Sequence, residues 1–168
     1  MSIRTANIND SAQLISLFEA LDQESTFMLL EPSERDTSLE NQQKQMANFT
    51  DSNTQVMLVK ENDKAELIAF VVGIAGNFIR NKHSLYCVIG VKSEYHGKGI
   101  GHSLLTGLEE WANNHGIHRI ELTVMEHNLK AIRLYEKFGF IREGIKRDSI
   151  CIAGEYINEL NMSKLLNK

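Results

Sequence analysis

The chain has 168 residues and a mass of 19.1 kDa, with 42% hydrophobic side chains, 24% charged side chains and one proline. These values describe one soluble globular domain and exclude disordered, collagen-like and low-complexity proteins. The longest apolar run covers nine residues, 67–75, whereas a membrane-spanning helix needs roughly 20. Residues 1–30 lack the pattern of a secretion signal. We therefore expect a single domain over residues 1–168 of a cytoplasmic protein that does not bind membranes.

The net charge of −4 is unevenly distributed along the chain. Residues 1–53 carry nine acidic and three basic side chains, and residues 54–168 carry thirteen acidic and fifteen basic ones. The isoelectric point near 5.9 does not indicate the basic surface that a nucleic-acid partner would need. The acidic first part forms solvated helix faces by default, and it is also suited to attract a cationic substrate.

The cysteines and histidines indicate neither disulfides nor a metal site. Cys87 and Cys151 lie in apolar stretches without CxxC spacing, which is typical of reduced core thiols. His115 and His118 are three residues apart, but Gly116 ends the predicted helix between them, so they need not share a face. No cluster has metal-ligand spacing, and no metal is expected.

The predicted elements of the first half are two helices followed by three strands. A short strand at residues 2–5 precedes an amphipathic helix that Asn9–Ser11 can cap. Residues 24–36 are predicted as an acidic loop and residues 37–49 as a more polar helix. Three segments rich in Val, Ile, Leu, Phe and Tyr follow, and short turns make them antiparallel neighbours: 55–60, 66–76 and 84–91.

From Gly97 onward the pattern alternates between helix and strand. The expected elements are a helix from 100 to Gly116, a strand at 119–124, a helix from Asn128 to Gly139, and final strands at about 140–146 and 150–162. The chain is therefore predicted to be an α/β domain in which an antiparallel first half joins a strand–helix–strand crossover.

A glycine-rich turn links the strand ending at Val91 to the following helix. Glycines at 97, 99 and 101 permit unusual backbone conformations, and the free N–H groups of the helix's first turn favour a phosphate. The alternative is that the three glycines only form a tight turn. No P-loop template is present, and the third glycine comes one position too early for a dinucleotide fingerprint. Nicotinamide or flavin binding is therefore the weaker alternative, with Glu121 about 20 residues downstream but in the middle of a strand.

Two motifs in this region resemble those of the GNAT (GCN5-related) N-acetyltransferases. The segment His96-Gly-Lys-Gly-Ile-Gly101 is similar to the acyl-CoA-binding turn Arg/Gln-x-x-Gly-x-Gly/Ala, although His96 replaces the preferred Arg or Gln. Residues 128–140 are similar to the motif Asn-x-x-Ala-x-x-Leu-Tyr-x-x-x-Gly-Phe, in the family's order and spacing. The resemblance implies a mixed, mostly antiparallel sheet with a splayed central parallel strand pair, flanked by about four helices. Parts of the chain look most like small bacterial ribosomal-protein and amino-acid acetyltransferases.

The resemblance also implies direct transfer of acetyl from acetyl-CoA to a primary amine, without a metal. The strand before the turn would expose backbone groups at Ile89 and Val91, and the Val91 amide would stabilise the oxyanion. Tyr135 would donate a proton to the departing thiolate, although an aromatic on an apolar helix face is the ordinary alternative. The family's glutamate base is absent, because Leu85 takes its position. Candidate bases by residue type alone are Glu24, Glu31, Glu126 and His83.

The residues expected to contact acetyl-CoA come from the strand end and the two motifs. They are Ile89, Val91, His96, Gly97, Lys98, Gly99, Ile100, Gly101, His102, Asn128, Ala131, Tyr135 and Lys137. Asn128 is also a natural helix cap, and Lys98 and Lys137 are equally well explained as solvated surface charges.

The acceptor side in relatives is formed by the first two helices, their loop and the final hairpin. Because this front region is acidic here, we expect a cationic acceptor near Glu24 and Glu31: a polyamine, an amino-sugar antibiotic, or a protein N-terminus or lysine. Two other functions remain open, a non-catalytic acyl-CoA sensor and a dinucleotide-dependent oxidoreductase. A homodimer through an exposed final strand is also left open.

Overall fold

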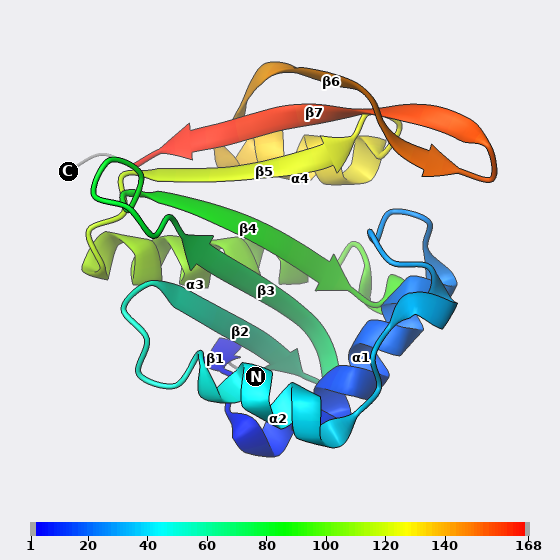
Figure 1. Cartoon of the computed structure of the whole chain (residues 1–168), viewed down its shortest axis with the longest axis vertical. Coiled ribbons are helices and arrows are strands. Elements are labelled where there is room, and N and C mark those ends of the chain that lie inside the picture. The colour runs from blue at the N-terminus through cyan, green and yellow to red at the C-terminus, as the bar shows by residue number, and fades with distance from the viewer. Residues whose placement is uncertain (1–2, 167–168) are drawn as a thin grey trace.

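The computed structural model describes residues 3–166, which form one seven-stranded mixed sheet (Figure 1). The strand order is β1-β2-β3-β4-β5-β7-β6, and β4 and β5 form the parallel pair within an otherwise antiparallel sheet. The strands are β1 (Ile3–Thr5), β2 (Gln55–Glu61), β3 (Leu67–Ala75), β4 (Ser84–Val91), β5 (Arg119–Met125), β6 (Ile141–Ile152) and β7 (Glu155–Leu165). The predicted mixed sheet is confirmed, and residue 2 of the predicted first strand lies outside the described residues.

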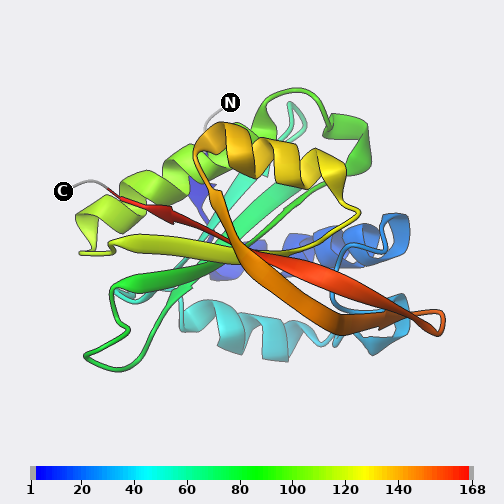
Figure 2. The same ribbon diagram turned by 90° about the horizontal axis from the view of Figure 1, so that it is seen from above.

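Four α-helices cover the sheet on its two faces. They are α1 (Ser11–Glu24), α2 (Leu39–Ala47), α3 (Ile100–Asn114) and α4 (Leu129–Phe138). Figure 2 shows α3 and α4 together on one face, with α1 and α2 on the other. No helix within residues 3–166 is long and apolar enough to cross a membrane.

Each helix pair buries its own hydrophobic core against the sheet. Leu104 and Leu108 of α3 are completely buried in the core that Val71 and Leu85 share. Leu14 and Phe18 of α1 join a second core with strand residues on the opposite face. Alternate side chains of the central strands therefore pack into two different cores, which explains why β3 has a continuous apolar sequence.

The final hairpin differs from its prediction. The sequence placed a break near residues 147–149, but β6 runs through them to Ile152, and the turn is at Ala153–Gly154, both with positive φ. A bulge between Lys146 and Ile150 absorbs the irregular residues, and the Asn158 side chain accepts a hydrogen bond from the Asp148 N–H at 2.9 Å.

The expectation for the cysteines is half right. Cys87 is buried on β4, and burial raises the pKa of its thiol to about 12. Cys151 is exposed, because β6 is an edge strand with few buried residues. The apolar residues around Cys151 therefore do not mark a core position.

The parallel strands β4 and β5 separate soon after they pair. Their pairing covers Ser84–Tyr86 and Arg119–Glu121 and then stops, so Cys87–Val91 have no partner strand on the β5 side. We call this unpaired region the split. The Lys92 N–H donates to the Ile68 carbonyl on the β3 side at 3.0 Å. Because alternate residues of a strand point to opposite neighbours, the N–H and C=O groups of Val91 and Ile89 point into the split. The predicted splayed strand pair is confirmed.

Candidate active site

The glycine turn leaves an open space at the start of α3. Gly97 and Gly99 have φ values of +75° and +76°, a left-handed conformation that favours glycine. A Cβ built at either position would meet no atom within 4 Å. Gly99 is also the N-cap of α3, so this helix has no side-chain cap, whereas Asn128 caps α4. The first-turn N–H groups of α3 are therefore available to bind an anion.

Gly101 serves a different purpose from the other two glycines. A Cβ at this position would lie 2.7 Å from Cδ2 of Leu134, which belongs to α4. The third glycine is therefore explained by close packing of α3 against α4. Its N–H group still belongs to the first turn, together with those of Ile100 and His102.

The His96 side chain is turned back toward β4. Its Nε2 lies 2.8 Å from the Val91 carbonyl oxygen, and because a carbonyl can only accept, Nε2 carries the proton and donates it. Ser93 in the same loop is fixed by Glu24, whose carboxylate accepts from the Ser93 N–H at 3.0 Å and from its hydroxyl at 2.8 Å. Glu24 therefore holds the loop after β4.

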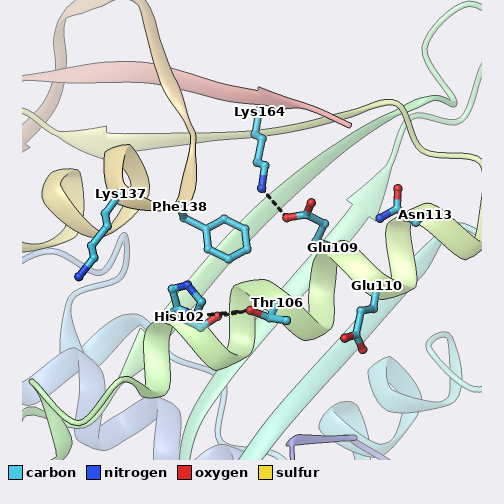
Figure 3. Close-up of a pocket in the computed structure, with 8 residues that line it drawn as sticks. All are labelled: His102, Thr106, Glu109, Glu110, Asn113, Lys137, Phe138 and Lys164. Carbon is cyan, nitrogen blue, oxygen red and sulfur yellow. Dashed lines mark hydrogen bonds and ion pairs between the residues drawn. The ribbon is translucent and has the colours of Figure 1, made fainter. Parts of the chain in front are cut away.

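Two predicted cofactor residues lie together in a groove between α3 and α4 of about 390 Å³ (Figure 3). His102 packs edge-on against Phe138, with ring centroids 5.1 Å apart, and Lys137 lies at the same end of the groove. On the other side of Phe138, whose ring centre lies 4.2 Å from the Lys164 ammonium, Lys164 and Glu109 form an ion pair of 2.6 Å. The groove thus places Lys137, which forms no ion pair with any of residues 3–166, beside the end of α3 that can bind an anion.

The remaining motif residues have local contacts. The Lys98 ammonium lies 4.8 Å from the centre of the Tyr95 ring, so it is held beside the turn. The Asn128 Oδ1 accepts from the Ala131 N–H at 3.3 Å, which makes Asn128 a helix cap and leaves its Nδ2 for another partner.

Tyr135 of α4 packs in the core that α3 and α4 share with β4. The residue is 7% exposed, and burial raises the pKa of its phenol, with further contributions from the neighbouring Cys87 and Tyr86. Within residues 3–166 every buried side-chain polar atom has a hydrogen-bond partner, and the Tyr135 hydroxyl has none, so its oxygen reaches open space. Tyr135 is therefore a protonated phenol with a free hydroxyl, which are the properties of a proton donor.

A second pocket, of about 280 Å³, is lined in part by Tyr86, Glu121 and Thr123, which alternate along β4 and β5 with the core residues that face α3 and α4. We call it the sheet-face pocket; it is lined by Tyr86, Arg119, Glu121, Leu122, Thr123, Glu143, Asn161 and Met162. Arg119 donates to Glu121 and Glu143 at 2.7 Å each. Arg119, together with the Ser163 hydroxyl, lowers the pKa of Glu143 to about 2. The strand predicted at 119–124 contains Arg119, Glu121 and Thr123, but the sequence gives no signal that Glu143 joins them.

The candidate bases fall at different ends of the sheet. His83 precedes β4, and its carbonyl accepts from the N–H groups of His118 and Arg119, so it lies at the end opposite Val91. Glu126 follows β5 and accepts from Asn158 at 3.2 Å. Glu31 is exposed in the loop between α1 and α2. That loop contacts the end of β5, because the Phe27 and His127 rings are 5.1 Å apart.

The comparisons with known proteins identify the family. The sequence model of the "Acetyltransferase (GNAT) family" matches residues 15–140, which is most of the chain. The chain belongs to the GNAT acetyltransferases. It is thus an N-acetyltransferase that uses acetyl-CoA, and the dinucleotide-dependent oxidoreductase considered from the sequence is set aside.

Named relatives and solved structures are similar to much of the chain. The chain is 31% identical over 121 residues to the spermidine N(1)-acetyltransferase of Vibrio cholerae, which is 69% of each chain. It is similar over 98% of both chains to the crystal structure of a GNAT acetyltransferase from Streptococcus pneumoniae, with a TM-score of 0.93 and 28% identity. The fold also matches yncA of Salmonella typhimurium, solved with its cofactor acetyl-CoA, with a TM-score of 0.86, 19% identity and coverage of 100% and 95%. The chain spans 21% to 69% of the length of the first curated relatives it matches.

The residues at the turn fit the anionic pyrophosphate of this GNAT cofactor. The open space at Gly97 and Gly99 and the uncapped start of α3 suit a phosphate, and Lys98 and Lys137 supply positive charge nearby. Among residues 3–166 no group of three or more His, Cys, Asp or Glu side chains could hold a metal ion.

Proposed function

We propose that this acetyltransferase modifies a cationic primary amine of the polyamine type by direct transfer. The observation that carries the proposal is the split, because the unpaired edge of β4 lies between the two faces of the sheet. The uncapped N-terminus of α3 and the Tyr135 hydroxyl serve the face that α3 and α4 cover, and the acceptor approaches from the face of α1 and α2.

Each residue of the site has a proposed role in the transfer. Acetyl-CoA supplies the activated acetyl group. The first-turn N–H groups of α3 hold its pyrophosphate, and the Val91 N–H donates to the thioester oxygen, where negative charge develops. Tyr135 gives its proton to the sulfur as the carbon–sulfur bond breaks. The acceptor's nitrogen forms the new amide bond after losing a proton to solvent or to a nearby carboxylate such as Glu126.

Charge supports a cationic acceptor over a neutral or anionic one. Residues 1–53, which include α1, α2 and their loop, carry nine acidic and three basic side chains. Glu31 lies exposed in that loop, and Glu126 lies at the end of β5 beside it. A positively charged amine is attracted to this side before it meets any specific contact. The spermidine N(1)-acetyltransferase relative supports the same acceptor class.

A panel of acceptors tests the proposal. With acetyl-CoA as donor, release of free thiol is measured for spermidine, an aminoglycoside, a neutral-side-chain amino acid and an acidic peptide with a free N-terminus. We expect the highest kcat/KM for the polycationic amine, and a fall in that value as ionic strength rises. Preference for the amino acid or the acidic peptide would contradict a cationic acceptor, while leaving the family assignment intact.

A further inference from the structure

The end of β4 presents two backbone groups of Val91 to the split. Val91 and Ala69 are the last residues that pair between β4 and β3, and the Lys92 N–H donates to the Ile68 carbonyl at 3.0 Å. The N–H and the C=O of Val91 therefore both point away from β3. In the proposed function the N–H donates to the thioester oxygen. An unpaired carbonyl oxygen beside it would oppose the negative charge that develops there.

The side chain of His96 meets this carbonyl. Its Nε2 donates to the Val91 oxygen at 2.8 Å, while the N–H of the same peptide group, which belongs to Lys92, donates to Ile68. Because a peptide group is planar, hydrogen bonds at both of its ends fix its orientation. Without His96 this last peptide of the strand would be held from the β3 side alone.

The imidazole of His96 starts from a turn that is itself well anchored. Ser93–Tyr95 form a single 3₁₀ turn, and the His96 N–H donates to the Ser93 carbonyl at 3.1 Å. Glu24, the last residue of α1, accepts from the N–H and the hydroxyl of Ser93. On another side of the turn the Tyr95 hydroxyl accepts from Asn62 Nδ2 at 3.2 Å. The backbone of His96 is thus held in a place from which its ring reaches Val91.

The hydrogen bond from His96 is not needed to satisfy the carbonyl. His96 is exposed, so water can reach this end of the strand and donate to the Val91 oxygen in its place. A fixed imidazole differs from water because it holds the carbonyl in one direction and needs no reorganisation when charge develops nearby. The contact therefore has a use in catalysis that solvent would not provide.

We propose that His96 is a positioning residue for the acetyl transfer. Its Nε2–H fixes the peptide after Val91 and offsets the negative charge of that carbonyl, so that the Val91 N–H is directed at the thioester oxygen. The inference rests on the proposed function, in which the Val91 N–H stabilises the oxyanion. His96 acts only through the backbone of Val91, so its removal affects the reaction more than the binding of acetyl-CoA.

Infrared spectroscopy of bound acetyl-CoA tests the proposal without any acceptor. Acetyl-CoA with ¹³C at the thioester carbonyl is added to the protein, and the frequency of the labelled C=O stretch is measured. A carbonyl that accepts a hydrogen bond absorbs at lower frequency than a thioester in an aprotic solvent, and we expect this lowering in the wild type. His96→Ala should move the band to higher frequency. His96→Gln, whose side-chain amide can donate to the Val91 carbonyl, should keep the wild-type band.

Kinetics with the panel amine that reacts best give the second readout. We expect His96→Ala to lower kcat about tenfold and to change the KM for acetyl-CoA by less than about twofold, and His96→Gln to recover most of kcat. His115→Ala is the matched control, because His115 Nδ1 donates to the Trp111 carbonyl at 2.7 Å at the far end of α3. The control loses the same kind of hydrogen bond and should keep the wild-type band and kcat.

Three results in His96→Ala would overturn the positioning role. An unchanged band with unchanged kcat would mean that the contact has no part in the reaction. A raised KM for acetyl-CoA with unchanged kcat would mean that His96 contacts the cofactor instead. Tighter binding of acetyl-CoA would mean that the ring competes with the cofactor for the Val91 carbonyl. Each of these results leaves the proposed function intact.

Failures of the proposed function give different results. If the wild-type band is not lowered, the Val91 N–H does not bind the thioester oxygen, and the roles of Val91 and His96 are both wrong. If none of the cationic amines is acetylated, the acceptor class alone is wrong, because the infrared measurement of His96 involves no acceptor.

Discussion

Tyr135 combines burial with a hydroxyl that has no protein partner. A buried polar group is normally hydrogen-bonded, because an unsatisfied one destabilises the fold by about 1–3 kcal/mol. Here the exposed fraction is 7%, yet the hydroxyl oxygen is not fully buried. The raised pKa keeps the phenol protonated throughout the range in which an enzyme is assayed. These properties are useful for donating a proton and have no evident benefit for packing.

Removing that hydroxyl separates catalysis from structure. We expect Tyr135→Phe to lower kcat by about 10²-fold, because the thiolate would leave without a general acid. The KM for acetyl-CoA and the melting temperature should change little, since the ring and its contact with Phe140 remain. Tyr156→Phe, at an exposed site on β7, is the matched control and should have wild-type kinetics. Unchanged kcat in Tyr135→Phe would mean that the thiolate leaves unaided and that Tyr135 only fills the core.

Some side-chain directions could not be predicted from the sequence. The motif placed His96 where the family uses Arg or Gln, which suggested a contact with the cofactor. In the structure the ring donates to the Val91 carbonyl, a backbone group five residues earlier that points into the split, and its contact with the cofactor stays a prediction. Glu24 accepts hydrogen bonds from Ser93, which the sequence did not indicate, and its expected place near the acceptor stays a prediction. Both outcomes depend on how a loop closes in three dimensions, which a one-dimensional pattern does not contain.

At the scale of elements, two helices fix the shape of the turn. The sequence predicted the helix beginning at 100 and the helix beginning after Asn128, and both are present. It could not show that they touch at Gly101 and Leu134, because contact between helices depends on their crossing. Helix packing alone therefore requires the third glycine, and binding of a phosphate by its N–H group stays a prediction.

Gly101→Ala tests this packing role. Its new Cβ would lie 2.7 Å from Leu134 Cδ2, so we expect the free energy of unfolding to fall by about 1–3 kcal/mol. Leu134→Ala in the same background should recover part of that loss, because it removes the side chain that clashes. Denaturant unfolding of the single and double variants measures the coupling. Additive losses in the double variant would show that the two residues are not in conflict and that Gly101 has another purpose.

The register of β6 in the final hairpin could not be predicted from the sequence. Two register shifts, between Arg142 and Gly144 and between Lys146 and Ile150, decide which residues face Arg119. Strand propensity and alternation do not predict bulges, since each bulge inserts a residue without changing composition. The family motifs end at Phe140, so they carried no information about this segment.

At the scale of the whole molecule, ion pairs between distant strands make stability depend on pH. Arg119 on β5 joins Glu143 on β6, and Arg4 on β1 joins Asp10 before α1. Both carboxylates have lowered pKa values, because each accepts hydrogen bonds from its arginine. A group whose pKa is lower in the folded state stabilises the fold above its unfolded pKa, and this stabilisation is lost as the pH falls.

The pH range is set by Glu143. Its pKa falls from 4.5 to about 2 on folding, so its contribution is complete above about pH 4.5 and is lost as the pH approaches 2. We expect Glu143→Gln to be less stable than the wild type near neutral pH and to lose less stability than the wild type over that acidic range. Urea unfolding at several pH values measures both slopes. Parallel slopes for the two proteins would show that Glu143 titrates alike in the folded and unfolded states.

Binding of the cofactor is the property that involves the whole molecule most directly, because the proposed function uses the turn, the split and α4 together. Acetyl-CoA at 100 times its dissociation constant adds about 2.7 kcal/mol to the free energy of unfolding. For a domain of this size that raises the melting temperature by about 5–10 °C. We expect this shift with acetyl-CoA and none with NAD, whose fingerprint the turn lacks.

Tyr135→Phe should keep the shift while losing turnover, since its role follows binding. A Gly99→Val variant should lose the shift, because a β-branched residue resists the left-handed conformation and its side chain enters the open space that we propose for the phosphate. An equal shift with NAD, or a shift that survives Gly99→Val, would mean that the turn is not where the cofactor binds.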